Sequence, residues 1–247
     1  MISPDQVRLA MPREKTVRRD TGSQVVTYEE HHWLLLSQLR QRAIVVMAVL
    51  EQTGNDPLIH GSICRGDVSE HSDVDVYIPK VVPSFSVEFA LTQAGYQIIH
   101  RELVHATPFH AIKAHIFLPN NSVVTFPLTN PAPIELEFYQ FGGCLTKGEL
   151  EKGRRVPGVD KRLILIEPID AGHIENAVVG NETVVAKKVG VNQKIVEERV
   201  KILMRRDEVG RTGVYLKRTL SPDDTFESLL KHISDRDPVV RRRIQKG

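Results

Sequence analysis

The stretch Leu58–Pro79, L-I-H-G-S-I-C-R-G-D-V-S-E-H-S-D-V-D-V-Y-I-P, decides the fold that the sequence predicts. It begins as a short apolar strand, passes through Gly61-Ser62 into a polar loop or short helix, and ends in a second apolar strand. That second strand carries Asp73 and Asp75. Residues two apart on a strand lie on the same face, about 7 Å apart, so the two carboxylates can share a divalent metal. A Gly-Ser turn ahead of a helix offers backbone N–H groups to a phosphate, and the combination suits nucleotidyl transfer.

The segments around this stretch predict a mixture of helices and strands. Residues 28–52 place apolar side chains at three- and four-residue steps, which is typical of an amphipathic helix, and turn residues follow at 53–57. After the stretch, the pattern predicts a helix over 84–94, strands over 96–104 and 112–118, a hairpin joining 114–118 to 123–128, and an alternating strand over 134–139. This order predicts an α+β fold class, with a mixed sheet flanked by helices.

Composition and charge set further bounds. The chain has 247 residues, 41% hydrophobic and 26% charged, which fits one large or two smaller hydrophobic cores. Its net charge of +2 is too small to indicate a nucleic-acid partner by itself. Residues 181–247, however, hold 16 Lys and Arg against 10 Asp and Glu, a surplus of +6 that leaves −4 on the rest. A basic C-terminal part and an acidic front part suggest two different roles.

The cysteines and the hydropathy indicate a cellular setting. Cys64 and Cys144 lie far apart without the spacing of metal ligands, which is typical of reduced thiols in an intracellular protein. The N-terminus lacks the apolar core of a signal peptide, and no window approaches the ~20 apolar residues of a membrane span. We therefore expect a cytoplasmic protein that makes no membrane contact.

Three further segments carry expectations of their own. Residues 1–28 predict either a loosely held arm or an early edge strand. Residues 142–175 hold five Lys and Arg near glycines over 152–162, and the segment could line a phosphate-binding face or form a surface linker with one extra strand. The C-terminal part predicts a short helix over 183–189, a longer helix over 193–206 and a hairpin over 209–216, an order that resembles a winged helix-turn-helix.

Residues 61–76 resemble the DNA polymerase β-type nucleotidyltransferase superfamily, and most closely its minimal nucleotidyltransferases and predicted archaeal members of similar length. That group has an apolar strand, G-S, a following A-R-G, and then S-D-x-D with apolar flanks. The matching positions here are Gly61-Ser62, Arg65-Gly66 and Ser72-Asp73-Val74-Asp75, with Cys64 where the group often has Ala. The resemblance is strong over about residues 30–80, weaker to about 140, and beyond that concerns architecture only.

The resemblance implies a nucleoside triphosphate as substrate and Mg²⁺ (or Mn²⁺) as cofactor. Two such metals would activate the attacking hydroxyl and neutralise the leaving pyrophosphate, and Mg²⁺ suits oxygen ligands. Ser62 and the Gly61 backbone would contact the triphosphate, Arg65 would add a phosphate contact, and Ser72 would shape the start of the strand. The resemblance thus implies a nucleotide-binding role for Gly61, Ser62, Arg65 and Ser72. It implies a metal-binding and catalytic role for Asp73 and Asp75.

The superfamily usually adds a third acidic residue on a later strand. Glu137 and Glu135 are the candidates, because both project to one side of the strand predicted over 134–139, and Glu137 is preferred as catalytic and metal-binding residue. The alternative is that Glu135 and Glu137 have no catalytic role and belong to the charged outer face of a half-exposed strand. His105, His110 and His115 recur at five-residue steps, which match neither a helix nor a strand face, so they are better placed beside the site than in a metal cluster.

We therefore expect an N-terminal arm over 1–29, a nucleotidyltransferase domain over 30–175 and a winged-helix-like domain over 176–247. The first functional hypothesis is metal-dependent transfer of a nucleoside monophosphate to an acceptor hydroxyl on RNA, protein or a small molecule. The alternative is a nucleic-acid-binding regulator that uses the nucleotidyltransferase-like domain as a ligand sensor. Its phosphate contacts would come from basic residues of the longer C-terminal helix, although Glu197 and Glu198 weigh against this: Lys194, Arg199, Lys201, Arg205 and Arg206.

Overall fold

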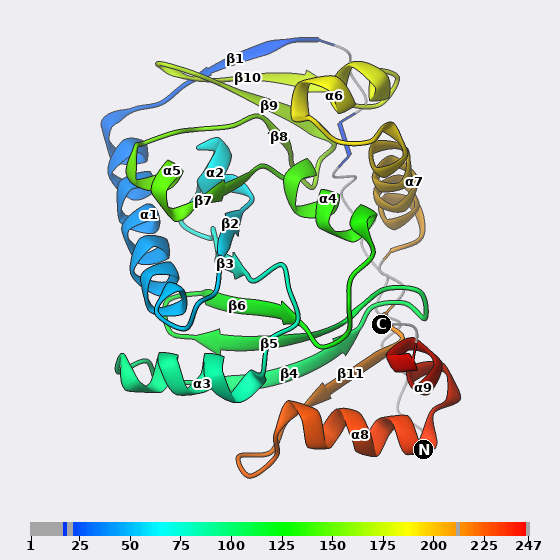
Figure 1. Ribbon diagram of the computed structural model, residues 1–247. Coiled ribbons are helices and arrows are strands. Elements are labelled where there is room, and N and C mark those ends of the chain that lie inside the picture. Colours follow the sequence, from blue (N-terminus) through cyan, green and yellow to red (C-terminus); the bar gives the residue numbers. More distant parts are fainter. Residues whose placement is uncertain (1–16, 19–21, 211–212, 246–247) are drawn as a thin grey trace, which may run out of the picture.

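The computed structural model describes residues 17–18, 22–210 and 213–245, and these form an α+β fold with two sheets (Figure 1). The larger sheet has the strand order β11-β4-β5-β6-β3-β2-β7, and the smaller has the order β1-β10-β9-β8. In Figure 1 the small sheet lies at the top of the molecule, together with α6, and β4, β5 and β6 lie below.

The larger sheet consists of β2 (Leu58–His60), β3 (Val74–Tyr77), β4 (His100–His105), β5 (Ile112–Leu118), β6 (Ser122–Pro127), β7 (Cys144–Thr146) and β11 (Leu216–Thr219). The smaller sheet consists of β1 (Gln24–Thr27), β8 (Gly158–Val159), β9 (Ile164–Ile169) and β10 (Gly172–Ala177). The helices are α1 (Glu30–Glu51), α2 (Ser62–Arg65), α3 (Ser84–Gln93), α4 (Pro133–Phe141), α5 (Lys147–Glu151), α6 (Glu182–Val189), α7 (Gln193–Val209), α8 (Phe226–Arg236) and α9 (Pro238–Gln245).

The two faces of the larger sheet have different neighbours. Val76 on β3, Val124 on β6 and Ile116 on β5 are paired side by side and fully buried in the main core, which also contains residues of α1, α3, α8 and α9. Because successive side chains of a strand point to opposite faces, the residues between them point away from this core. Asp75 and its paired neighbour Val123 therefore belong to the opposite face.

Several predicted elements are confirmed. The predicted helix over 28–52 is α1, whose buried residues, among them Leu36 and Met47, pack into the main core. The predicted hairpin is β5 and β6, and Asn120 and Asn121 at its turn adopt positive φ values of 59° and 53°. Within the described ranges, α1 is also the one helix long and apolar enough to span a membrane by length and composition, a window that the sequence expectation missed. That window is 44% buried inside the protein.

The strand predicted over 134–139 is wrong, because this segment is the helix α4. Pro133 occupies its first turn, where a fixed φ and a missing N–H are tolerated. The Glu135 side chain accepts the backbone N–H of Ala132 (3.0 Å), which caps the helix start. The alternation I-E-L-E-F fits a strand, but the prolines and this cap favour a helix.

The separate winged-helix-like domain over 176–247 is also wrong. α7 ends at Val209, and Leu216–Thr219 form β11, which pairs antiparallel with β4 at the edge of the larger sheet. Residues 211–212 of the hairpin predicted over 209–216 lie outside the described residues. Phe226 of α8 and Val240 of α9 are fully buried in the main core. The C-terminal part therefore completes the same body that residues 30–175 begin.

The segment expected to be an arm is likewise integrated where the structure describes it. Gln24–Thr27 form β1, which pairs antiparallel with β10 at the edge of the small sheet, so the edge-strand alternative holds for these residues. Residues 1–16 and 19–21 of the predicted arm lie outside the described residues. A second core joins the small sheet to α6 and α7, through buried residues such as Val159, Leu165, Val185 and Val196.

We predict that Phe226→Ala lowers the free energy of unfolding of the whole chain by about 3–5 kcal/mol, as expected for removal of a fully buried aromatic ring. Phe85→Ala on α3, where the side chain is 73% exposed, is the matched control and should change it by less than about 1 kcal/mol. Urea unfolding followed by circular dichroism measures both. Two separate transitions, with only the smaller one shifted by Phe226→Ala, would contradict the single body.

Candidate active site

Asp73 and Asp75 lie where two cavities of the molecule meet. Asp75 is on β3 and Asp73 directly precedes this strand. One cavity, of about 410 Å³, we call the turn cavity; its lining includes Gly61, Ser62, Ser72, Lys161 and Arg162. The other, of about 550 Å³, we call the aromatic cavity; its lining includes Lys113, His115, Thr125, Phe138 and Tyr139. Both cavities are lined by the two aspartates, so a ligand in either can reach the carboxylates.

The Gly-Ser turn, Gly61 and Ser62, lines one side of the turn cavity. Gly61 has φ 90° and directly precedes α2, and its own N–H donates to the Gly143 carbonyl (2.9 Å), so the expected contact of this amide with a phosphate is wrong. The first amides of α2, at Ser62 and Ile63, have no carbonyl partner within the helix. Ser62 Oγ donates to Ser72 Oγ (3.3 Å), which accepts the Ser69 N–H (2.9 Å). These hydroxyls tie the two ends of the loop that leads to β3.

Arg65 lines the turn cavity and is also held by the protein around it. Its guanidinium donates twice to Asp67, with both distances 2.9 Å, and once to the Gly142 carbonyl (2.5 Å). The Arg65 side chain is 6% exposed. These bonds use three of the five guanidinium N–H groups, so the phosphate contact that the resemblance implied for Arg65 stays a prediction.

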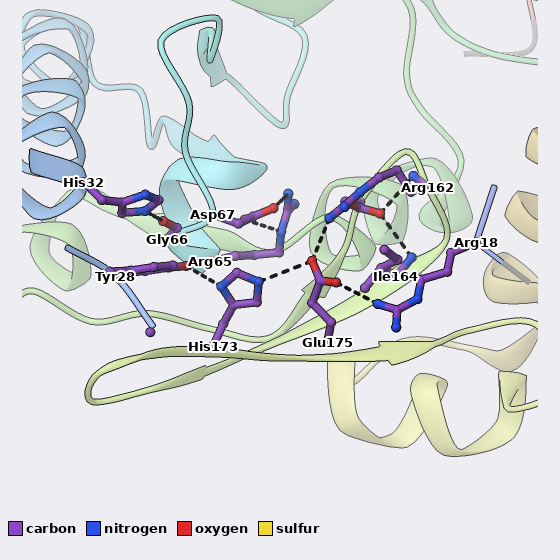
Figure 2. Close-up of polar contacts among 12 residues, drawn as sticks. Arg18, Tyr28, His32, Arg65, Gly66, Asp67, Arg162, Ile164, His173 and Glu175 are labelled. Atoms are coloured by element: carbon purple, nitrogen blue, oxygen red, sulfur yellow. Dashed lines mark hydrogen bonds and ion pairs between the residues drawn. The ribbon is translucent and has the colours of Figure 1, made fainter. Parts of the chain in front are cut away.

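A polar network behind this loop joins it to the small sheet (Figure 2). The Tyr28 hydroxyl and His173 Nδ1 are hydrogen-bonded (2.7 Å), and a ring nitrogen of His32 contacts the Gly66 carbonyl (2.7 Å). Glu175 on β10 accepts hydrogen bonds from both Arg18 (2.7 Å) and Arg162 (2.8 Å). The small sheet thereby fixes the segment that carries Arg162.

Lys161 precedes Arg162 in that segment and is exposed in the lining of the turn cavity. Arg162 is neutralised by Asp160 and Glu175, whereas Lys161 makes no hydrogen bond or ion pair with any residue that the structure describes. Burial and the neighbouring Asp73 raise the pKa of Asp75 to about 6, and the charge of Lys161 counteracts part of this rise. Of the two expectations for residues 142–175, this placement favours the phosphate-binding face.

The carboxylate pair fits a divalent cation. Asp73 and Asp75 are close enough for the charge of one to raise the pKa of the other, a repulsion that a cation would relieve. Carboxylate oxygens are ligands that Mg²⁺ and Mn²⁺ accept. Over the described residues, no group of three or more His, Cys, Asp or Glu side chains is arranged to hold a metal. The site thus offers two protein carboxylates.

The predicted third acid is not among them. Glu137 lies on α4, outside the linings of both cavities, and its carboxylate accepts the Asn192 N–H (2.6 Å) at the start of α7. Glu135 does line the aromatic cavity, but its two oxygens accept the backbone N–H groups of Ala132 (3.0 Å) and Ala111 (2.8 Å). The assignment of Glu137 is therefore wrong, because the segment is a helix and turns this side chain toward α7.

Tyr139 organises the aromatic cavity. Its ring stacks on Tyr77 at 3.7 Å and meets His60 edge-on at 4.9 Å between centroids. Burial, followed by the charges of Arg65 and Lys113, lowers the pKa of His60 to about 4. Burial and the charge of Lys113 likewise lower the pKa of His115 to about 4. Both imidazoles are therefore neutral at pH 7.

The helix α7 closes both cavities. Arg199 lines each of them, and its guanidinium lies 4.8 Å from the centroid of the Phe138 ring. Burial and the neighbouring Arg206 lower the pKa of Arg199 to about 10. Arg199 Nε is buried without a hydrogen-bond partner among the described residues. The sequence suggested Arg199 for nucleic-acid contact in a separate domain. In the structure Arg199 instead lines the two cavities that Asp73 and Asp75 share.

Comparison with models of protein families, with curated proteins and with solved structures finds no match to this chain. The turn cavity is lined by the start of α2 and by Lys161, which has no carboxylate partner among the described residues. The aromatic cavity lies beside it, and the carboxylates of Asp73 and Asp75 line both. Such an arrangement can hold a metal-bound phosphate chain at the turn and a second molecule beside it. Of the residues involved, Lys113, Arg199 and Tyr139 were not assigned to the site from the sequence.

Gly158→Ala should disturb the backbone that supports the Gly61-Ser62 turn. A Cβ atom at Gly158 would lie 2.5 Å from Gly143 N and 2.6 Å from Gly142 C. The carbonyls of Gly142 and Gly143 accept the hydrogen bonds of Arg65 and Gly61. We predict a loss of about 2 kcal/mol or more in the free energy of unfolding, measured by urea titration.

The matched control is Gly148→Ala in α5, where a Cβ meets no atom within 4 Å. It should be neutral or stabilising by up to about 1 kcal/mol, because Ala has the higher helix propensity. Equal unfolding free energies of Gly158→Ala and the wild type would contradict the close approach.

The buried neutral imidazole of His115 should make the fold sensitive to acid. Its pKa is about 4 in the folded protein and about 6.5 when unfolded, so between these values the unfolded chain binds more protons. The free energy of unfolding therefore falls as pH is lowered through this window. In His115→Gln the fall from pH 6.5 to pH 4 should be smaller by about 1–3 kcal/mol. His232→Gln, at an exposed position of α8, is the control and should keep the wild-type slope.

Proposed function

We propose that this protein is a metal-dependent nucleotidyltransferase with a nucleotidyltransferase-type fold. It would transfer a nucleoside monophosphate from a nucleoside triphosphate to an acceptor hydroxyl and release pyrophosphate. The observation that carries the proposal is the position of Asp73 and Asp75 at the junction of the turn cavity and the aromatic cavity. The resemblance of residues 61–76 to the DNA polymerase β-type superfamily supports the same reaction.

The turn cavity suits the triphosphate. Ser62 contributes a hydroxyl and the first amides of α2, and Lys161 contributes an ammonium group without a carboxylate partner among the described side chains. Arg199 reaches the boundary of both cavities with a buried guanidinium. Phosphoryl-group chemistry depends mainly on such positioning and charge stabilisation. These groups would hold the phosphate chain with its α-phosphorus toward the aspartates.

The aspartates would hold Mg²⁺ or Mn²⁺. When bound, such ions activate the acceptor hydroxyl and neutralise charge on the pyrophosphate. The loop from Ser62 to Ser72 holds the start of β3 in place, so that Asp73 and Asp75 meet the metal without rearrangement. The aromatic cavity, on the other side of the pair, would receive the acceptor.

The regulator hypothesis loses its structural support. It required a winged helix at the C-terminus, whereas α7 lies against the cavities and β11 belongs to the larger sheet. Lys194, Lys201 and Arg205 remain exposed on α7, and nucleic acid stays one possible class of acceptor.

Transfer is tested with each of the four α-labelled nucleoside triphosphates, Mg²⁺ and fractionated cell extract. We predict labelled product with at least one nucleotide, and at least a 100-fold lower rate for Asp73→Asn and Asp75→Asn, because each removes a metal-binding charge. Asp56→Asn, at a side chain that is 90% exposed, is the matched control and should keep the wild-type rate. Product formation that persists in both site variants would refute the proposal.

A further inference from the structure

Lys113 places a positive charge in the aromatic cavity. Its ammonium donates to the Tyr139 hydroxyl (3.0 Å) and lies 5.0 Å from the centroid of the same ring. The ring of Tyr77 lies further away, 5.9 Å from the ammonium. Aromatic faces attract a cation but do not neutralise it.

No carboxylate described in the structure lies within 4 Å of the Lys113 ammonium. The carboxylate whose charge acts on Lys113 is that of Glu135, and it raises the lysine pKa. The oxygens of Glu135 already accept the N–H groups of Ala111 and Ala132, and one lies 3.9 Å from the Arg243 guanidinium. Burial lowers the pKa of Lys113, because the charged form loses hydration there. A desolvated charge is costly unless an opposite charge offsets it.

The sheet register sets how far this cation lies from the carboxylates. Asp75 pairs with Val123, which pairs with Phe117, whereas Lys113 is four residues before Phe117 on β5. Four residues along a strand span roughly 13 Å, and the two strand spacings from β3 to β5 add about 10 Å across the sheet. The lysine and aspartate side chains shorten the gap between their charged ends. A molecule with a hydroxyl at one end and an anionic group several bonds away fits that gap within the cavity of about 550 Å³.

We propose that Lys113 binds an anionic group of the acceptor, and that the acceptor is a small hydroxy compound carrying a phosphate or a carboxylate. This inference rests on the proposed nucleotidyl transfer. Arg199 and Arg206 also line this cavity and add positive charge to it, beside the carboxylates of Glu135 and Glu198. The hydroxyl of the acceptor would lie at Asp73 and Asp75, and the anionic group of the acceptor would lie at Lys113, beside Tyr139.

The test is calorimetric titration of the full chain with Mg²⁺ and the non-transferable analogue α,β-methylene-ATP. Three probes follow: ribose 5-phosphate, gluconate and uncharged ribose. We expect at least one anionic probe to bind 10-fold or more tightly than ribose. The two anionic probes distinguish a phosphate from a carboxylate as the preferred group.

Two variants assign the preference to Lys113. Lys113→Met, which removes the charge and keeps a side chain of similar length, should abolish the difference between anionic probe and ribose. Lys113→Arg should retain at least part of it. Binding of the nucleotide analogue should be the same within 2-fold in both variants, which also shows that they are folded. An anion preference that is absent in the wild type, or unchanged in Lys113→Met, overturns the inference.

The two proposals fail in different ways. If the nucleotide analogue binds and depends on Asp73, but no anionic probe is preferred, the inference about the acceptor falls and nucleotidyl transfer stands. If the analogue does not bind, or binds equally well to Asp73→Asn, the proposed function falls and the acceptor inference falls with it. Labelling of RNA rather than of small molecules in cell extract would also overturn the inference.

Discussion

The parallel pairing of β3 with β6 determines which side chains face the cavities. Val74 pairs with Ser122 and Tyr77 with Thr125, so Val76 enters the main core and Asp75 points to the other face. A shift of one residue would exchange these faces, placing a carboxylate in the core and a valine at the site. The apolar residues that fill the core therefore fix the position of the acid, and stability and site geometry depend on the same register.

The small sheet supports the site from the side. Its strand β10 carries His173, which is hydrogen-bonded to Tyr28, and Glu175, which accepts from Arg162 in the lining of the turn cavity. Arg155 adds to this connection, since its guanidinium donates to the Gly172 carbonyl (2.8 Å) and lies 4.8 Å from the centroid of the Trp33 ring. The loop that precedes β3 is itself held from α1, through His32, and from the backbone at Gly142–Gly143. Such external support keeps a charged loop in one conformation before any ligand binds.

The sequence was most informative where local patterns decide the structure. The stretch over 58–79, the helix α1 and the hairpin of β5 and β6 depend on short-range periodicity and turn residues, and all three were predicted. The helix α4 was missed because alternation of apolar and charged residues suits a strand and a short helix alike, and only Pro133 and the Glu135 cap distinguish them. The edge strand β11 pairs with β4, more than a hundred residues earlier, and no local pattern indicates such a partner.

The same limit applies to the site. Asp73, Asp75 and Ser62 were identified from one contiguous motif, whereas Lys113 and Arg199 reach the cavities from β5 and α7. Their positions depend on how the sheet and the second core assemble. Arg65 lines the turn cavity as the motif suggests, but the motif alone does not reveal that its guanidinium also donates to Asp67 and Gly142.

The most direct test is a crystal structure of the protein with Mg²⁺ and α,β-methylene-ATP. The account predicts the triphosphate in the turn cavity, beside Ser62 and Lys161, with metal density between the phosphates and the carboxylates of Asp73 and Asp75. The aromatic cavity should remain open toward Lys113. A nucleotide bound away from the two aspartates, or a triphosphate held at Lys113 with the turn cavity empty, would contradict it.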